Sequence, residues 1–269
     1  MKQNYSVISA YLFTALSELP LLREQLLDEC SQLGLKGTIL LAEEGINLTL
    51  AGTEMAITTI QAYLSQVAGL SALEYKLSPA NILPFGQLLV KIKPEIISLD
   101  RPQFDPAPFE QTHLPAVTFK QWLDEKRDVL VLDTRNRYET ASGHFENAYL
   151  LPIDSFRDFP TQVAQLDPSF KQKPIVMYCT GGVRCEKAAA VMVEQGFSEI
   201  YQLDGGILKY FEECGGAHYK GECFVFDERI GLTPELKESQ AILCEKCQYP
   251  VTLAEQQVAG ACLHCADTL

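Results

Sequence analysis

The sequence predicts an α/β protein with two domains and a short cysteine-rich tail. Apolar strands alternate with amphipathic helices over residues 5–214, and a proline-rich stretch at 101–117 divides this alternation in two. A chain of 269 residues is long enough to bury two separate cores. We therefore expect domains at 1–100 and 118–220, a linker at 101–117 and a cysteine-rich extension at 221–269.

The first domain is predicted to follow the order β-α-β-β-α-β. A strand is expected at 5–13, and an amphipathic helix at 20–34 ends at a glycine. Residues 35–52 predict two strands joined by a turn, and 53–70 predicts a helix whose first residue, Thr53, is a typical cap. Strands at 72–79 and 87–97 complete a ferredoxin-like, acylphosphatase-like arrangement.

The second domain is predicted to contain a parallel sheet. Its expected elements are a helix at 119–126, strands at 128–134, 147–153 and 173–179, a helix at 183–196, and a strand, turn and helix over 198–214. Continuous apolar strands between helices are typical of a sheet that is covered on both faces. Ligands in such folds bind beyond the carboxyl ends of the strands, and Cys179 stands at such an end.

The loop that begins at Cys179 has the composition of an anion cradle. Its residues are Cys179, Thr180, Gly181, Gly182, Val183, Arg184 and Cys185. Two glycines allow a tight turn, so that successive N–H groups can point at the Cys179 sulfur. The start of the next helix and the Arg184 guanidinium favour a thiolate, which is the nucleophilic form of cysteine. The same cradle would also hold a persulfide or an anionic substrate group.

Two residues of the loop have alternative roles. Arg184 either contacts an anion or supports the loop from within. Cys185 either resolves an oxidised Cys179 as a disulfide or packs as a small residue at the helix start. The sequence leaves both pairs of alternatives open.

The second domain resembles the rhodanese family of sulfurtransferases. The pattern C-x-x-x-x-R after an apolar strand resembles the rhodanese active-site loop. DTRNRYET, with Asp133, Arg135 and Glu139, resembles a D-x-R-x-x-x-E segment, and GHFENAYLLPI and LDGGILKY resemble two further rhodanese segments. Asp133, Arg135 and Glu139 either face the site or form a structural ion-pair network. The loop alone implies transfer of a Cys179 persulfide to a small-molecule or protein acceptor.

A longer resemblance covers nearly the whole chain. AEEGINLTLAG, CTGGVRCEKA and GGAHYKGECFVFDERI, in this order, together resemble the rhodanese-domain tRNA uridine(34) hydroxylases. This resemblance implies 5-hydroxylation of the wobble uridine, with tRNA as the partner, dioxygen as co-substrate and Cys179 as the essential catalytic residue. Sulfur transfer remains the alternative function.

The last four cysteines form two C-x-x-C pairs that predict a structural zinc site. These cysteines are Cys244, Cys247, Cys262 and Cys265. Fourteen residues separate the pairs, slightly fewer than the roughly 15–20 that are common between zinc knuckles. Neither pair is followed by the glycine that many knuckles use. Free thiols or oxidised pairs are the alternatives.

Composition limits the other function classes. The net charge of −13 lacks the basic footprint of nucleic-acid binders, so we expect no DNA binding, and tRNA must be held by a local patch, shape or stacking. No apolar run predicts a membrane span, and no signal peptide is seen. Nine cysteines are an odd number, so they cannot all form disulfides within the chain. We therefore expect a cytoplasmic protein with reduced thiols. No dinucleotide fingerprint, facial triad or haem motif predicts NAD, flavin, non-haem iron or haem.

Overall fold

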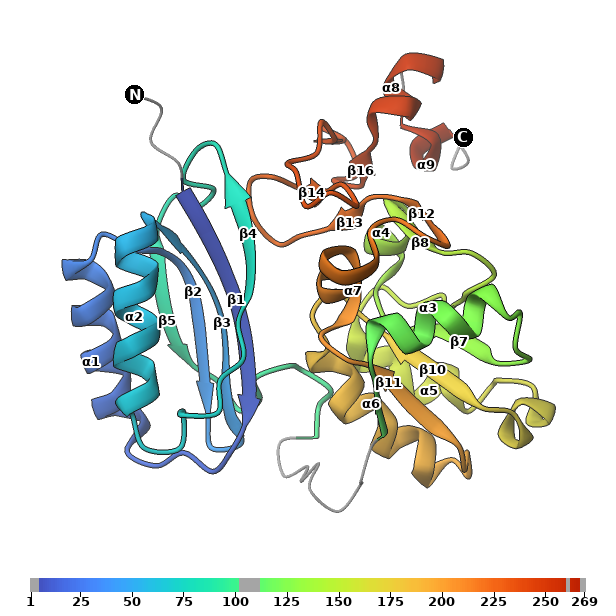
Figure 1. The fold of residues 1–269 in the computed structure, drawn as a ribbon, viewed down its shortest axis with the longest axis horizontal. Coiled ribbons are helices and arrows are strands. Elements are labelled where there is room, and N and C mark those ends of the chain that lie inside the picture. The colour runs from blue at the N-terminus through green and yellow to red at the C-terminus, as the bar shows by residue number, and fades with distance from the viewer. Residues whose placement is uncertain (1–4, 102–111, 260–261, 267–269) are drawn as a thin grey trace. The chain divides into compact units, whose positions relative to one another are not determined.

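The protein forms two compact units, residues 1–110 and 111–269 (Figure 1). The computed structural model describes residues 5–101, 112–259 and 262–266. Most of the expected linker, residues 102–111, therefore lies outside the described residues. Within the described part of the chain, no helix is both long enough and apolar enough to cross a membrane.

The first unit is a five-stranded sheet with two helices on one face (Figure 1). Its elements are β1 (Tyr5–Phe13), α1 (Leu19–Gln32), β2 (Lys36–Ala42), β3 (Gly45–Gly52), α2 (Glu54–Gln66), β4 (Lys76–Ala80) and β5 (Leu88–Ile92). The strand order is β4-β1-β3-β2-β5, antiparallel except for the β2–β5 pair. Thr53 caps α2 as expected, because its hydroxyl accepts the Ala56 N–H at 3.2 Å.

The core of this unit lies between the helices and the sheet. Alternate strand residues such as Ile8, Ile39 and Leu48 are fully or almost fully buried, and they meet Leu26 of α1 and Leu64 of α2. The strand period of two and the helix period of 3.6 thus bring one apolar face of each element inward. The predicted α/β fold is confirmed, with five strands where the order β-α-β-β-α-β has four.

The hairpin of the AEEGINLTLAG motif holds the chain that follows β5. Glu44 accepts the Ile96 N–H at 2.7 Å, and the Asn47 amide donates to the Ile96 carbonyl at 3.0 Å. Gly45 has φ 146°, and a Cβ there would lie 2.0 Å from the Leu12 carbonyl oxygen. Only glycine allows this close approach between β3 and β1.

The second unit contains a parallel sheet in the order β6-β11-β10-β7-β9 (Figure 1). Its strands and helices are β6 (Thr112–Leu114), α3 (Ala116–Asp124), β7 (Leu130–Asp133), α4 (Arg137–Thr140), β8 (Gly143–Phe145), β9 (Tyr149–Leu150), α5 (Phe159–Val163), β10 (Ile175–Tyr178), α6 (Val183–Glu194), β11 (Ile200–Leu203) and α7 (Gly206–Cys214), with 3₁₀ turns η1 (Phe156–Asp158) and η2 (Pro168–Gln172). The predicted parallel sheet is confirmed.

Two parts of this unit differ from the expectation. Strand β6 lies inside the stretch that was expected to be linker, because Leu114 is buried and pairs in register with Leu203 of β11. A three-residue edge strand is too short to give a periodic pattern. Residues 154–172, for which no element was expected, form η1, α5 and η2.

The first residues after 215 pack against the rest of the second unit. β12 (Tyr219–Gly221) pairs with β8, and β13 (Cys223–Phe224) pairs with β14 (Gly231–Leu232). The ring of Phe145 meets four rings edge-on, with centroids 4.8–5.1 Å apart: Phe119, Tyr178, Tyr210 and Tyr219. Each such pair is worth about 0.5–1.5 kcal/mol beyond its area, so Tyr219 anchors β12 in the core. β15 (Ile242–Leu243), β16 (Pro250–Val251), α8 (Leu253–Ala259) and α9 (Leu263–Ala266) follow.

Candidate active site

Cys179 is the first residue after β10, and its loop curls back over its own sulfur. Gly182 is the residue before α6 and has φ 104°. This conformation directs the Gly182 N–H at the Cys179 Sγ, at 3.1 Å. A residue with a side chain would be strained at this φ, so the second glycine is required. Gly181 is not among the residues with positive φ, and a Cβ there would meet nothing within 4 Å. The first glycine is therefore not demanded by the backbone.

The loop makes Cys179 a thiolate at neutral pH. Burial raises the pKa of this thiol, because the sulfur is only 1% exposed. The Cys185 S–H, the Arg184 charge and the N–H groups of Arg184 and Gly182 together lower the pKa by more than burial raises it, so the pKa is about 6. Hydrogen bonds and a positive charge that stabilise the anion thus outweigh the cost of desolvating it.

Cys185 is the protonated partner of this thiolate. Burial, and then the hydrogen bond to Cys179, raise the pKa of Cys185 well above its ordinary value. The Thr134 hydroxyl lies 3.7 Å from the Cys185 sulfur and donates to the Tyr178 carbonyl at 3.0 Å. One cysteine of the pair therefore holds the negative charge and the other supplies a proton to it.

The back of the loop is held by the start of α7. Ile207 N–H donates to the Cys179 carbonyl at 3.0 Å, and Leu208 N–H donates to the Thr180 carbonyl at 3.1 Å. Gly206 has φ 65°, and a Cβ there would lie 2.5 Å from the Cys179 carbonyl oxygen. The LDGG segment is thus part of the site, because its second glycine permits this contact.

Arg184 points into the protein and pairs with Glu139. Its two terminal nitrogens each lie 2.6 Å from a Glu139 oxygen, and both side chains are buried. Burial lowers the pKa of the Arg184 guanidinium, but the Glu139 carboxylate raises it by more. This geometry is the one expected if Arg184 supports the loop from within.

Asp133 and Arg135 form a second, fully buried ion pair. Arg135 donates to both Asp133 oxygens and, at 2.7 Å, to the Gly143 carbonyl, which ties the end of β7 to β8. The guanidinium carbon lies 5.7 Å from the centre of the Tyr178 ring, next to the cysteine. Both members of this pair are internal, as in the structural ion-pair interpretation.

Several residues of the site were not singled out in the sequence. Thr134, Gly206 and Gln202 all contact the loop or its cysteines; the Gln202 amide donates to the Gly182 carbonyl at 3.3 Å. Thr134 lies within DTRNRYET and Gly206 within LDGGILKY, so the motifs carried a signal for both. Gln202 has no such signal.

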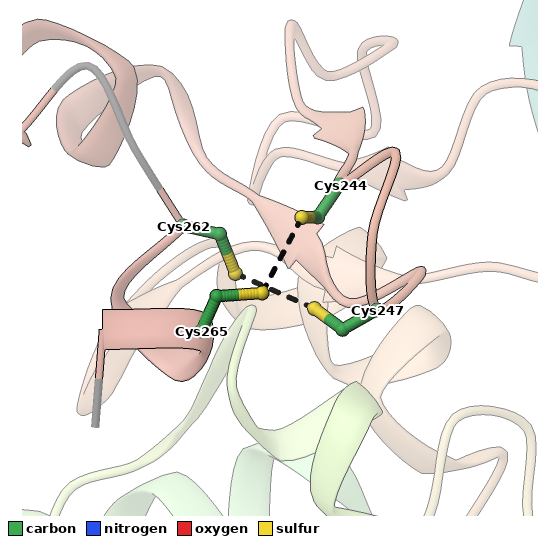
Figure 2. A group of neighbouring side chains, drawn as sticks. All are labelled: Cys244, Cys247, Cys262 and Cys265. Carbon is green, nitrogen blue, oxygen red and sulfur yellow. Dashed lines mark hydrogen bonds between the residues drawn. The ribbon is translucent and has the colours of Figure 1, made fainter. Parts of the chain in front are cut away.

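The four C-terminal cysteines converge on one point (Figure 2). Their sulfurs all lie within 4.8 Å of one another, with Cys244 and Cys265 at 3.8 Å and Cys247 and Cys262 at 3.6 Å. A tetrahedron of thiolates about 2.3 Å from zinc has edges of about 3.8 Å. These separations therefore match a zinc tetrathiolate and are far too long for disulfide bonds.

Gln248 takes the place of the missing knuckle glycine. It has φ 61°, in the left-handed region that favours glycine. Its N–H donates to the Cys244 carbonyl at 2.9 Å, and Cys244 N–H donates to the Tyr249 carbonyl at 2.8 Å. The first pair thus forms a closed knuckle without glycine.

Comparison with known proteins agrees with both halves of the fold. A model of the UPF0176 acylphosphatase like domain matches residues 5–96, and a model of the rhodanese-like domain matches residues 116–213. A rhodanese-like domain protein from Staphylococcus aureus, known from its crystal structure, is 26% identical, with a TM-score of 0.32, over 37% of this chain and 91% of its own.

Relatives of known name match almost from end to end. A tRNA uridine(34) hydroxylase of Cupriavidus metallidurans is 45% identical over 271 residues, which cover 97% of this chain and 96% of the relative. That of Ralstonia nicotianae is 46% identical over 270 residues, with the same coverage. That of Bordetella petrii is 46% identical over 240 residues, covering 87% of this chain and 95% of the relative.

An acylphosphatase-like domain followed by a rhodanese-like domain, with a thiolate at the end of a central strand, defines a rhodanese-domain protein. The 45% identity to the Cupriavidus metallidurans protein, along nearly the full length of both chains, identifies the family within this class. The chain belongs to the tRNA uridine(34) hydroxylase family. The family indicated by the three sequence motifs is thereby confirmed.

The lowered pKa of Cys179 predicts an unusual pH dependence of its reactivity. The thiolate is present above the folded-state pKa and is lost as the pH falls through about 6. Alkylation of Cys179 by iodoacetamide, followed by mass spectrometry, should be half-maximal near pH 6, whereas an ordinary thiol requires about pH 8.5. Cys185→Ala removes the S–H donor and should move the midpoint upward. A midpoint at or above that of an ordinary thiol in the unchanged protein would contradict this account.

Replacing Glu139 should destabilise the second unit. Glu139→Gln leaves the Arg184 charge buried without a counter-charge, a change that ordinarily costs about 3–5 kcal/mol in the free energy of unfolding. The pKa of Cys179 should also fall, because the Arg184 charge is no longer offset. The matched control is Arg137→Met, which breaks the Arg137–Asp154 pair with side chains 51% and 61% exposed and should cost less than about 1 kcal/mol. Urea unfolding of the two variants measures both changes in the free energy of unfolding. Equal costs would contradict the role of the buried pair.

Proposed function

We propose that this protein hydroxylates C5 of the wobble uridine of tRNA, with dioxygen as co-substrate and Cys179 as the catalytic residue. The observation that carries the proposal is the buried thiolate held by the Gly182 and Arg184 N–H groups, in a chain whose full-length relatives are named tRNA uridine(34) hydroxylase. The nine free thiols fit a reducing compartment, so we propose a cytoplasmic location.

The proposed role of Cys179 is addition to the pyrimidine ring. C6 of uridine is electrophilic because it is conjugated to the C4 carbonyl, and a thiolate that adds there makes C5 enolate-like. An electrophilic oxygen species at the peroxide level, formed from dioxygen and a two-electron donor, then transfers one oxygen atom to C5 as its O–O bond breaks. Its second oxygen atom leaves as water. Loss of the C5 proton and departure of the Cys179 thiolate restore the ring. A thiol with a pKa of about 6 is suited to both steps, since it is ionised at neutral pH and is a good leaving group.

The proposed roles of the other loop residues follow from their contacts. Thr180, Gly181, Gly182 and Val183 carry the backbone turn, and Gly182 N–H stabilises the sulfur anion. Arg184 stabilises the same anion by its charge, and Cys185 keeps it hydrogen-bonded. Asp133 and Arg135 support the strand end from which the loop leaves.

We further propose that Cys244, Cys247, Cys262 and Cys265 hold a structural zinc ion. The fit of their sulfur separations to a tetrathiolate supports this, and so does the closed knuckle at Gln248. Such a site with four protein ligands leaves no open coordination position for a substrate. Its role would be to fold the end of the chain.

Loss of Cys179 should abolish the tRNA modification. Cells that lack this protein should lack its 5-hydroxyuridine at position 34, and wild type and Cys214→Ala should restore it, whereas Cys179→Ala should not. Nucleoside mass spectrometry of purified tRNA measures this. Modification restored by Cys179→Ala would overturn the assignment. A Cys179 persulfide that forms from thiosulfate and turns over, without any effect on tRNA, would favour sulfur transfer instead.

Zinc content should depend on the cysteine cluster. Protein purified with a reductant should contain about one zinc per chain, and a chelator should lower its melting temperature. Cys247→Ser should lose the zinc, whereas Cys214→Ser, a cysteine of α7 outside the cluster, should keep it. Elemental mass spectrometry gives the metal content. A full zinc complement in Cys247→Ser would show that the metal lies elsewhere.

A further inference from the structure

The GECFVFDERI segment places an exposed aromatic ring beside the active-site loop. Phe226 is 59% exposed, although its neighbour Val225 is buried. The Arg184 guanidinium carbon lies 5.9 Å from the centre of the Phe226 ring. Arg184 also acts directly on the Cys179 sulfur, so the ring and the thiolate share Arg184 as a neighbour.

The ring stands on a rigid turn. Beyond the β13–β14 pair, Val225 N–H donates to the Ile230 carbonyl at 2.9 Å, and Ile230 N–H donates to the Asp227 carbonyl at 3.0 Å. Inside this turn, Arg229 forms two side-chain hydrogen bonds to the carboxylate of Asp227, at 2.8 and 2.6 Å, and both side chains are almost fully buried. The turn is thus fixed by an internal ion pair, while Phe226 faces the solvent.

Two further rings surround Phe226. Its centroid lies 5.3 Å from that of Phe224 and 6.4 Å from that of Tyr138, both edge-on. Tyr138 belongs to α4, the same short helix that supplies Glu139 to Arg184. The aromatic cluster and the Arg184–Glu139 ion pair therefore both include a residue of α4.

An exposed ring suits the substrate of an acidic protein. With a net charge of −13, the chain has little positive charge for phosphate contacts, and Arg184 is already paired with Glu139. Unpaired RNA bases present flat π-faces that stack on aromatic side chains without need of a cation. A ring next to a catalytic thiolate is where the base of a single-stranded loop would be held.

We propose that Phe226 is the stacking surface for an unpaired base of the tRNA anticodon loop as its uridine is presented to Cys179. This proposal rests on the proposed function and adds a binding residue to it. The stacked base is either the wobble uridine or one of its two neighbours in the loop. Phe226 acts in binding, and the charge state of Cys179 does not depend on it.

The test is the binding of a synthetic anticodon stem-loop to the full chain, followed by fluorescence anisotropy. Phe226→Leu keeps an apolar side chain but loses the π-face, and it should weaken binding roughly 5- to 100-fold, as the loss of one stacking ring does. Phe226→Tyr should bind like wild type. Val117→Ala, at a residue of α3 that is 60% exposed, is the matched surface control and should also bind like wild type.

Abasic stem-loops identify the stacked base. An abasic site at the stacked position should weaken binding to wild type but should not weaken binding to Phe226→Leu any further. Abasic sites at the wobble position and at each neighbour distinguish the three bases. The proposal is overturned if Phe226→Leu binds the intact stem-loop as tightly as wild type. It is also overturned if the loss of affinity of Phe226→Leu relative to wild type is the same on every abasic stem-loop.

Two further readouts separate stacking from structure and from the proposed function. Phe226→Leu should raise KM for tRNA and leave the rate of Cys179 alkylation at pH 7 unchanged; a parallel loss of alkylation would show a structural role and overturn the proposal. If wild type fails to form 5-hydroxyuridine while the base-dependent binding loss persists, the proposed function fails and the stacking surface stands.

Discussion

The buried pair between Glu139 and Arg184 is the contact on which the site depends. It joins α4, through Glu139, to the first turn of α6, through Arg184, across 45 residues of sequence. Two charges removed from water are stable only when each satisfies the other, so the bidentate geometry holds both elements in one position. The backbone N–H of Arg184 is thereby held toward the sulfur, and its guanidinium is held between the thiolate and Phe226.

Cysteines of the same chain differ widely because their surroundings differ. Burial, with a smaller contribution from Glu29, raises the pKa of Cys30 to about 12, and burial likewise raises that of Cys223 to about 12. Cys179 is as buried as these two, yet its pKa is about 6, because N–H groups, a thiol and a guanidinium all point at it. The pKa of each thiol is therefore set by the donors around its sulfur, since the three residues are about equally buried.

The sequence predicted what is encoded locally. The succession of strands and helices along the chain, the loop at 179–185 and the cap at Thr53 follow from periodicity and from residues a few positions apart. Contacts between distant segments could not be predicted in this way. Nothing near Arg184 indicates that its partner is Glu139, and nothing near Gln248 shows that it would adopt the backbone of a glycine. β6 could not be predicted, because three residues after a proline-rich stretch are too few to show an alternating apolar pattern.

The hydrogen bonds from α7 to the Cys179 and Thr180 carbonyls have a consequence for the protein at rest. They hold the first two peptide groups of the loop in place, so the turn that brings the Gly182 N–H to the sulfur is fixed where it begins. With a pKa of about 6, Cys179 is ionised in the resting protein at neutral pH, before any substrate arrives. Its protection is kinetic: Cys179 is only 1% exposed, so reagents reach its sulfur slowly.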